Sequence, residues 1–206
     1  MLKNIALTGV SGIGKDYIGD VLMRHYSYRK LSCVEPLRRC LYKHFSIPFS
    51  PDTIDKHLEY NFIFKNGNTI QGLLIKADDY LGEDGKNLMR EIMRHRFNIS
   101  NYHLIPVVIT NLRLPGELAY LDDFDIYRVV GDNPIREVQP FDNLLDDYNF
   151  KVILNKKPNL PKDILSQFSL NDFDFNREYD VLEEKKNYDE KILEFDDLIS
   201  QWDEIL

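Results

Sequence analysis

Short apolar runs alternate with segments of helical periodicity along most of the chain. The first run, Asn4–Thr8, is apolar along its centre and is followed by glycine, as is typical of a buried parallel strand. Behind it, Ile18, Val21 and Leu22 recur at the spacing of one helix face. The same criteria predict further strands at 29–32, 104–110, 125–130 and 150–154, and further helices at 35–47, 69–80 and 86–96. This alternation predicts an α/β fold in which helices cover both faces of a parallel sheet.

The end of the chain has a different pattern. Its apolar residues recur at steps of three and four on an otherwise acidic segment, at Tyr188, Ile192, Phe195, Ile199, Trp202 and Leu206. Asn187 and Glu190 resemble a capping box, which predicts that a helix begins there. We expect one domain over 1–170, followed by an acidic helical tail over 171–206. The apolar face of this tail either docks on the chain's own surface or receives a partner, such as a second copy of the chain in a homodimer.

Charge separates the same two regions. The net charge is −8, but residues 171–206 hold 13 acidic and 4 basic residues, so the tail carries −9 and the rest of the chain +1. This balance argues against nucleic-acid binding, which requires clustered Lys and Arg. The chain has no apolar leader and no run of about 18 apolar residues, so we expect a cytoplasmic protein without a membrane segment. Cys33 and Cys40 fit neither a disulfide framework nor a metal site, and buried or idle thiols are expected.

The segment between the first strand and the first helix carries the strongest chemical signal. The phosphate-loop pattern G-x-x-x-x-G-K is matched by Gly9-Val10-Ser11-Gly12-Ile13-Gly14-Lys15, followed by Asp16. Glycines let the backbone turn tightly and point N–H groups inward, and the start of the helix adds positive partial charge. Lys15 is expected to reach the β- and γ-phosphates of a nucleoside triphosphate. We therefore predict that the loop from Gly9 to Asp16 binds ATP.

Asp16 stands where most phosphate loops place Ser or Thr to supply a hydroxyl to Mg²⁺. A carboxylate at this position can bind the ion directly, hold one of its water molecules, or cap the first helix. Asp16 is therefore the candidate metal residue, and Mg²⁺ with ATP is the expected cofactor.

Three further segments resemble those of one family. Residues 31–39 contain Glu-Pro-Leu-Arg-Arg, residues 107–117 form a strand followed by Asn-Leu-Arg-Leu-Pro-Gly-Glu, and residues 151–155 form a strand ending in Asn. Together with the Gly-Lys-Asp of the loop, they resemble the bacteriophage deoxynucleoside monophosphate kinases, which are P-loop nucleoside monophosphate kinases. The matches cover most of residues 3–168. The resemblance implies a three-layer P-loop NTPase fold, a substrate-binding insertion at about 48–100, and transfer of the ATP γ-phosphate to a deoxynucleoside monophosphate.

The resemblance and the chemistry of phosphoryl transfer also suggest roles outside the loop, because cations must surround both reacting phosphates. Arg113, just past a strand, is expected to grip the acceptor phosphate and to act in catalysis with Lys15 and Asp16; its alternative is a surface ion pair with Glu117. At most one of Arg38 and Arg39 is expected to face the substrate, and the other is expected to face solvent. The remaining candidates are Glu35, Gln71 and Glu117 for substrate binding and Arg136 as a lid cation. The alternatives are that Glu35 only complements the dipole of its helix and that Arg136 is a solvated surface residue.

Two departures from the family keep other functions open. Asn111 stands where the family usually has Asp, and Gln71 stands near a position where Arg is common. One alternative is a P-loop kinase for another phosphorylated small molecule, since Gly-Lys-Asp also occurs in animal phosphomevalonate kinases. Another is a nucleotide-binding protein whose catalysis is weakened.

Overall fold

A parallel sheet and a group of helices make up the described part of the computed structural model, which comprises residues 3–45, 47, 63–64, 67–131, 144–155, 161–168 and 180–201. Contacts divide the chain into two units. We call Met1–Cys33 with Phe97–Val181 the sheet unit, and Val34–Arg96 with Leu182–Leu206 the helical unit. The expected domain boundary after residue 170 lies outside the described residues, as does the stretch 48–62 of the expected insertion.

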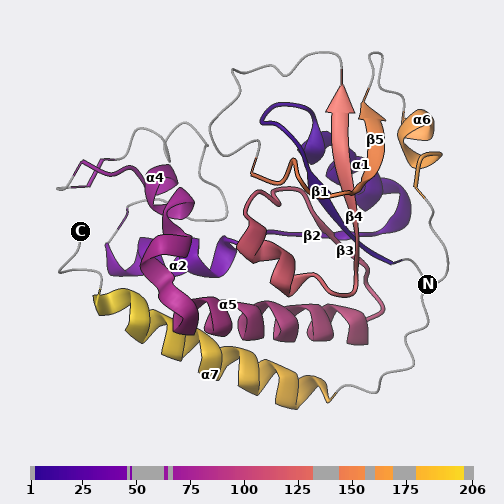
Figure 1. Ribbon diagram of the computed structural model, residues 1–206. Coiled ribbons are helices and arrows are strands. Elements are labelled where there is room, and N and C mark those ends of the chain that lie inside the picture. The colour runs from indigo at the N-terminus through magenta and orange to yellow at the C-terminus, as the bar shows by residue number, and fades with distance from the viewer. Residues whose placement is uncertain are drawn as a thin grey trace. The chain divides into compact units, whose positions relative to one another are not determined.

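The elements follow one another as the apolar pattern suggests (Figure 1). The sheet unit contains β1 (Asn4–Thr8), α1 (Lys15–Tyr26), β2 (Arg29–Leu31), β3 (Val107–Ile109), the 3₁₀ helix η1 (Pro115–Tyr120), β4 (Phe124–Gly131), β5 (Lys151–Asn155) and α6 (Pro161–Leu165). The helical unit contains α2 (Glu35–His44), α4 (Ile70–Ile75) and α7 (Val181–Ser200). The long helix α5 (Ala77–Tyr102) begins in the helical unit and ends in the sheet unit.

Within the described residues, five strands pair in parallel, in the order β2-β3-β1-β4-β5. β1 is the central strand, which explains why all five of its residues are buried. Because the strands are parallel, their carboxyl ends lie at one edge of the sheet. The segments at this edge are the loop from Gly9 to Gly14 after β1, Thr110 after β3, Gly131 at the end of β4 and Asn155 at the end of β5. Ligands of open α/β sheets bind beyond this edge.

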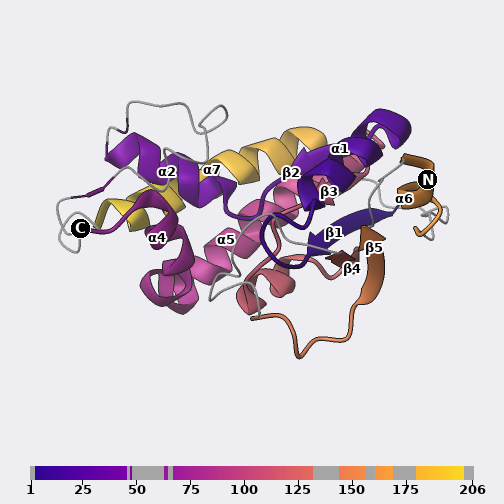
Figure 2. The ribbon, with the colours of Figure 1, turned by 90° about the horizontal axis from the view of Figure 1, so that it is seen from above.

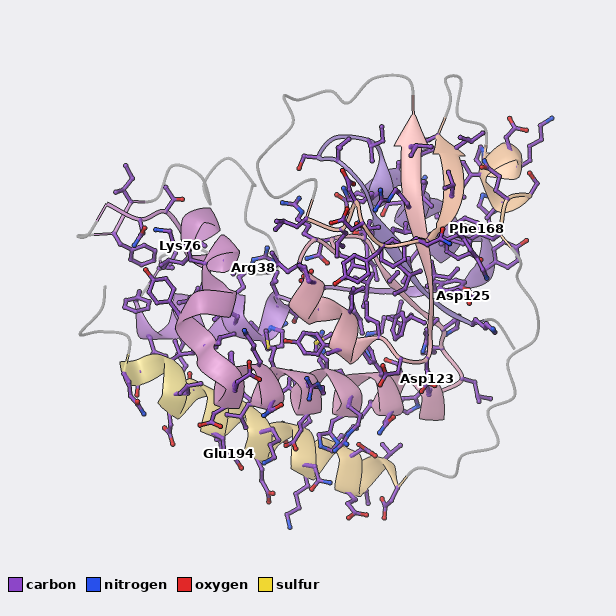
Figure 3. The ribbon with its side chains drawn as sticks, in the orientation of Figure 1. Arg38, Lys76, Asp123, Asp125, Phe168 and Glu194 are labelled. Atoms are coloured by element: carbon purple, nitrogen blue, oxygen red, sulfur yellow. The ribbon has the colours of Figure 1, made fainter. Side chains whose placement is uncertain are left out.

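The sheet is covered on both faces, as predicted. On one face, Leu7 packs in a core with Leu22 of α1 and Ile164 of α6. Phe168, labelled in Figure 3, joins this core with its ring centroid 5.0 Å from that of Tyr127 in β4. These apolar side chains fix α1, and therefore the loop that leads into it, against the central strand.

The last turns of α5 cover the opposite face. Asn4 precedes Ile5 in β1 and so points to the other side, where its Nδ2 donates to Asn101 Oδ1 at 3.4 Å. Phe97 packs against Phe124 with ring centroids 4.7 Å apart. The parallel sheet with helices on both faces confirms the expected α/β architecture.

In the helical unit, α7 lies antiparallel along α5 (Figure 2). Glu184 Oε2 lies 2.5 Å from His95 Nδ1, and Lys191 Nζ lies 3.2 Å from Glu91 Oε2. Glu194, labelled in Figure 3, lies on the outer side of α7, where it is half exposed. Helix α7, the described part of the acidic tail, therefore docks on the chain's own surface, the first of the two expectations for the tail. Trp202 and Leu206 of its predicted apolar face lie outside the described residues.

A second set of contacts joins α7 to α2. Asp196 pairs with Lys43 and, at 2.8 Å, with His44, while Phe195 is fully buried. Burial, followed by the neighbouring Asp196, raises the pKa of Cys40 to about 12, so this thiol is held in its protonated form. Cys33 is likewise a buried thiol, which agrees with the first part of the expectation of buried or idle thiols.

Several helix boundaries differ from those predicted. α2 ends at His44 rather than at 47, and the helix expected over 69–80 is interrupted at Lys76, between α4 and α5. The expected break at 82–85 is a kink at Gly82 alone (φ 60°, ψ −171°), and the following helix runs past Arg96 because its last turns pack on the sheet. α7 begins at Val181, so the capping box expected at Asn187 is wrong. Its first turns carry Glu184, which pairs with His95, and this distant contact is invisible in the apolar spacing.

Candidate nucleotide-binding site

The loop between β1 and α1 is shaped by its three glycines. Gly9, Gly12 and Gly14 have φ values of 129°, 79° and 96°, a region that side-chain-bearing residues rarely adopt. Gly14 is the N-cap of α1, so the loop ends on the first unsatisfied N–H groups of that helix. This is the tight glycine turn that the G-x-x-x-x-G-K spacing predicts, placed at the carboxyl edge of the central strand.

Lys15 turns back into the loop. Its side chain is buried, with the residue only 6% exposed, and its Nζ donates to the carbonyl oxygens of Gly9 and, at 2.9 Å, Val10. A buried ammonium is costly unless it is hydrogen-bonded, and here the loop backbone supplies the acceptors. Lys15 therefore closes the loop on itself and places a positive charge beside it.

A side chain from β5, the last strand in the order of the sheet, forms a hydrogen bond with the other half of the loop. Asn155, the last residue of β5, donates from Nδ2 to the carbonyl oxygen of Ile13 at 2.5 Å. A Cβ atom on Gly14 would overlap the same amide group. The loop is thus held at both ends, by Lys15 and by Asn155.

Asp16 lies in the first turn of α1, with its side chain half exposed. Its Oδ1 accepts a hydrogen bond from Thr110 Oγ1 at 2.7 Å and lies 2.9 Å from Lys30 Nζ. Lys30 also reaches Asp20, at 3.4 Å. Two neighbouring strands, β2 and β3, therefore orient the carboxylate that follows the loop lysine. Within the described residues, no group of three or more His, Cys, Asp or Glu side chains is arranged to hold a metal ion.

The segment after β3 carries the predicted acceptor-side residues. Asn111 donates from Nδ2 to Ser32 Oγ at 2.8 Å. Glu117 is buried, and its Oε2 accepts the backbone N–H groups of Arg113 (2.7 Å) and Leu114 (2.9 Å). Glu117 is therefore not a surface residue as the ion-pair alternative supposed. It fixes the turn into η1 and with it the backbone from which Arg113 extends.

The other substrate candidates belong to the helical unit. Glu35 pairs with Arg39 at 2.6 Å and with Arg96. Burial alone would raise the pKa of Glu35, but Arg96 and then Arg39 hold it below its ordinary value, so Glu35 is an anion engaged by two guanidinium groups. Arg39 is the exposed member of the arginine pair and Arg38 the partly buried one.

Of two further candidates, the structure describes one in part and the other not at all. Gln71 lies in the first turn of α4, and its side chain is outside the described part of the structure. Arg136, the expected lid cation, is outside it altogether.

Comparisons with known proteins add little to this geometry. No family model and no curated protein matches the chain. Among solved structures, the chain is similar to a gluconokinase from Sinorhizobium meliloti 1021, at 12% identity and a TM-score of 0.37, over 80% of this chain and 88% of that one. The chain has an α/β P-loop fold. The strand order and the phosphate loop between β1 and α1 show this fold. None of the helices in the described ranges combines the length and apolar content required to cross a membrane.

Sequence reasoning missed three residues around the loop, namely Lys30, Thr110 and Asn155. Lys30 and Thr110 have no local signal, because their relation to Asp16 depends on how β2 and β3 pack beside α1. Asn155 had a weak signal, since it is a polar residue at the end of an apolar strand, where parallel sheets gather their ligand-binding groups.

Proposed function

We propose that this chain is an ATP-dependent kinase that transfers the γ-phosphate of ATP to a nucleoside monophosphate, in particular a deoxynucleoside monophosphate, and forms the diphosphate. The observation that carries the proposal is the loop from Gly9 to Lys15, in which left-handed glycines close the backbone around a buried ammonium group. A polyphosphate at such a loop meets amide N–H groups, the positive end of a helix and a fixed cation. The acceptor class follows from the resemblance described above.

Mg²⁺ would neutralise the charge that develops between the β- and γ-phosphates. This ion prefers oxygen ligands and keeps several of its waters, and Asp16 offers a half-exposed carboxylate directly after Lys15. Because Thr110 and Lys30 already engage Oδ1 of this carboxylate, we propose that Asp16 holds the ion through water.

Arg113 is the proposed ligand of the acceptor phosphate. It follows β3 at the carboxyl edge of the sheet, and Glu117 fixes its backbone. A guanidinium group can bind a phosphate through two parallel hydrogen bonds, which suits a group that must align two reactants. Arg38, the partly buried member of the arginine pair, is proposed as a second substrate cation rather than the exposed Arg39. Arg136 keeps its proposed role as a lid residue.

Incubation of the purified chain with ATP, Mg²⁺ and each ribo- and deoxyribonucleoside monophosphate in turn tests the proposal. At least one monophosphate should yield its diphosphate together with an equal amount of ADP. Lys15→Met should lower kcat/KM by at least about 100-fold, because removing one group aimed at transition-state charge costs about 2.7–4 kcal/mol. Lys162→Met, which removes an exposed lysine of α6 from the same unit, is the matched control and should retain the wild-type rate. Unchanged turnover in Lys15→Met would reject the assignment.

A nucleotide-binding protein with weakened transfer is the second candidate. Asn111 presents a neutral amide, bonded to Ser32, at the position where the resemblance implies a carboxylate. Tight ATP binding without product from any nucleoside monophosphate would favour this candidate. A panel of other phosphorylated small molecules then separates it from a kinase with a different acceptor.

A further inference from the structure

We propose that Asn155 is a positioning residue of the phosphate loop, which holds the Ile13 carbonyl so that the N–H group of Gly14 is aimed at a bound polyphosphate. The inference rests on the proposed function, because it takes a nucleotide phosphate as the occupant of the loop. Its starting point is the 2.5 Å contact from Asn155 Nδ2 to Ile13 O, which joins residues 142 positions apart in the chain.

The chemistry of the contact sets the orientation of the Asn155 amide. A backbone carbonyl can only accept a hydrogen bond, so the NH₂ group of Asn155 must face Ile13, and the opposite orientation would bring two acceptor oxygens together. The backbone of Asn155 is itself fixed, because it pairs with Gly131 in the β4–β5 ladder. A rigid strand end therefore presents a donor to the loop.

Holding a carbonyl also sets the direction of the next N–H group. The peptide unit between Ile13 and Gly14 is planar and trans, so its C=O and N–H bonds point in opposite directions. With the Ile13 carbonyl turned toward Asn155, the Gly14 N–H must point away from β5. Gly14 could otherwise adopt other backbone conformations at low cost, because glycine tolerates φ of either sign. Asn155 removes that freedom.

The space around the contact is fitted to it. A Cβ on Gly14 would overlap Asn155 Nδ2, and a Cβ on Gly131 would lie 2.5 Å from the Asn155 carbonyl oxygen. Both glycines therefore allow β5 and the loop to approach closely. Gly14 has two separate reasons to lack a side chain, its φ of 96° and the nearness of Asn155.

Lys15 does for the first half of the loop what Asn155 does for the second. Its ammonium binds the carbonyls of Gly9 and Val10, so three loop carbonyls are held by nitrogen donors. By the same peptide geometry, the N–H groups that follow these carbonyls point the other way. A phosphate recognised by backbone amides requires this polarity, because the carbonyl oxygens would repel it.

Two variants of Asn155 and one matched control test the role. Asn155→Ala removes the donor, and Asn155→Asp also sets a carboxylate oxygen against the Ile13 carbonyl. The control is Gln167→Glu, since Gln167 is likewise a side-chain amide that bonds β5, through the N–H and C=O groups of Leu154, but it does not touch the loop. All three variants are expected to lower the thermal unfolding midpoint without ligand, because each removes a hydrogen bond to the backbone.

The discriminating measurement is the dissociation constant for ATP and for inorganic tripolyphosphate, obtained by calorimetry on each full-length variant. Asn155→Ala should raise both dissociation constants about tenfold and Asn155→Asp about 100-fold. This is the range expected when a hydrogen bond to a charged group, here from the Gly14 N–H to a phosphate, is weakened or lost. Gln167→Glu should bind both ligands as the wild type does. Tripolyphosphate has no base or sugar, so a parallel effect on both ligands assigns the loss to the phosphate loop.

Two other outcomes overturn the inference in distinguishable ways. If the wild-type chain binds ATP but both Asn155 variants bind it equally well, or if Gln167→Glu weakens binding as much as Asn155→Ala, then Asn155 only maintains β5, and the proposed function stands. If the wild-type chain binds neither ATP nor tripolyphosphate, the proposed function fails and the inference fails with it.

Discussion

The phosphate loop and the C-terminal helix α7 are held in place by different forces. The loop is held by hydrogen bonds that Lys15 and Asn155 donate to neutral backbone carbonyls of the loop. Carboxylates of α7 pair with cationic or titratable side chains of α2 and α5, as Asp196 does with His44 and Glu184 with His95. The loop therefore depends on backbone geometry, whereas α7 depends on ionisation.

This difference separates the sensitivities of the two regions. A hydrogen bond to a backbone carbonyl changes little with pH, but it fails when a side chain displaces the backbone by a fraction of an ångström. A charge pair tolerates small displacements and weakens when its carboxylate takes up a proton. Steric changes should consequently injure the loop most, and acid should injure the attachment of α7 most.

Gly14→Ala should give the largest effect. Alanine at φ 96° is strained, and its Cβ would overlap the Asn155 amide, so the free energy of unfolding should fall by about 2–5 kcal/mol if the two costs add. Urea unfolding of the purified variant measures the loss. ATP affinity should fall as well, because the loop cannot keep its shape.

A glycine in open space isolates the steric part of that effect. Gly67 also has a positive φ, 83°, but no atom lies within 4 Å of the position its Cβ would take, so Gly67→Ala should cost only the backbone strain, about 1–2 kcal/mol. Asn155→Ala should partly rescue Gly14→Ala, because it removes the clash. Equal losses in Gly14→Ala and Gly67→Ala, without rescue, would show that contact with Asn155 is unimportant.

Asp196→Asn should have the next largest effect, and one that depends on pH. Burial alone would raise the pKa of Asp196. The hydrogen bond from Lys43 and the nearby His44 lower this pKa by more than burial raises it, so the net pKa lies below the ordinary 3.8. A carboxyl group with a lowered folded pKa stabilises the fold above its unfolded pKa and loses this contribution as pH falls through the folded value. The variant should therefore lose about 1–3 kcal/mol near pH 7, and it should lose less near pH 3, where the wild-type carboxylate has begun to give up its contribution.

Urea unfolding at the two pH values checks this prediction, and an exposed carboxylate of the same helix serves as control. Glu194 is half exposed and pairs with Lys191 one turn away, so Glu194→Gln should cost no more than about 0.5 kcal/mol at either pH. If the difference in free energy of unfolding between wild type and Asp196→Asn stays constant with pH, then α7 is held by packing of residues such as Phe195 rather than by charge.

The part of the site that could be predicted from the sequence is the part that is local. The strand at 4–8, the glycine loop and the helix from Lys15 to Tyr26 were all predicted, because each has its own apolar period or glycine spacing within one continuous stretch. The parallel sheet followed from the alternation of such segments. The sequence therefore predicted the carboxyl edge of the sheet, but it did not predict which side chains converge there.

The contacts that complete the site could not be predicted, because they join distant segments. No periodicity relates Asn155 to Ile13, and none relates Thr110 to Asp16. The boundaries of α5 and α7 were misplaced for the same reason. Packing of Phe97 on the sheet extends α5, and the pair of Glu184 with His95 accompanies the early start of α7.

Substitutions of the two partners of Asp16 should have the smallest effects on the free energy of unfolding. A neutral donor, Thr110, and an ionic one, Lys30, both contact the same carboxylate oxygen of Asp16. Thr110 is buried, so Thr110→Val, which keeps the shape of the side chain and loses its hydroxyl, should cost about 1 kcal/mol. Lys30 and Asp16 are both partly exposed, so Lys30→Met should cost less than about 1 kcal/mol.

Salt separates the two contributions at Asp16. Raising NaCl from about 0.1 M to about 1 M shortens the screening length from about 10 Å to about 3 Å, which should abolish the cost of Lys30→Met and leave that of Thr110→Val unchanged. Urea unfolding at both salt concentrations measures the two costs. Lys30→Met could instead lower the free energy of unfolding more than Thr110→Val at both salt concentrations. The surroundings of the loop would then depend on charge, as α7 does. The contrast between backbone geometry and ionisation would hold only for the loop backbone itself.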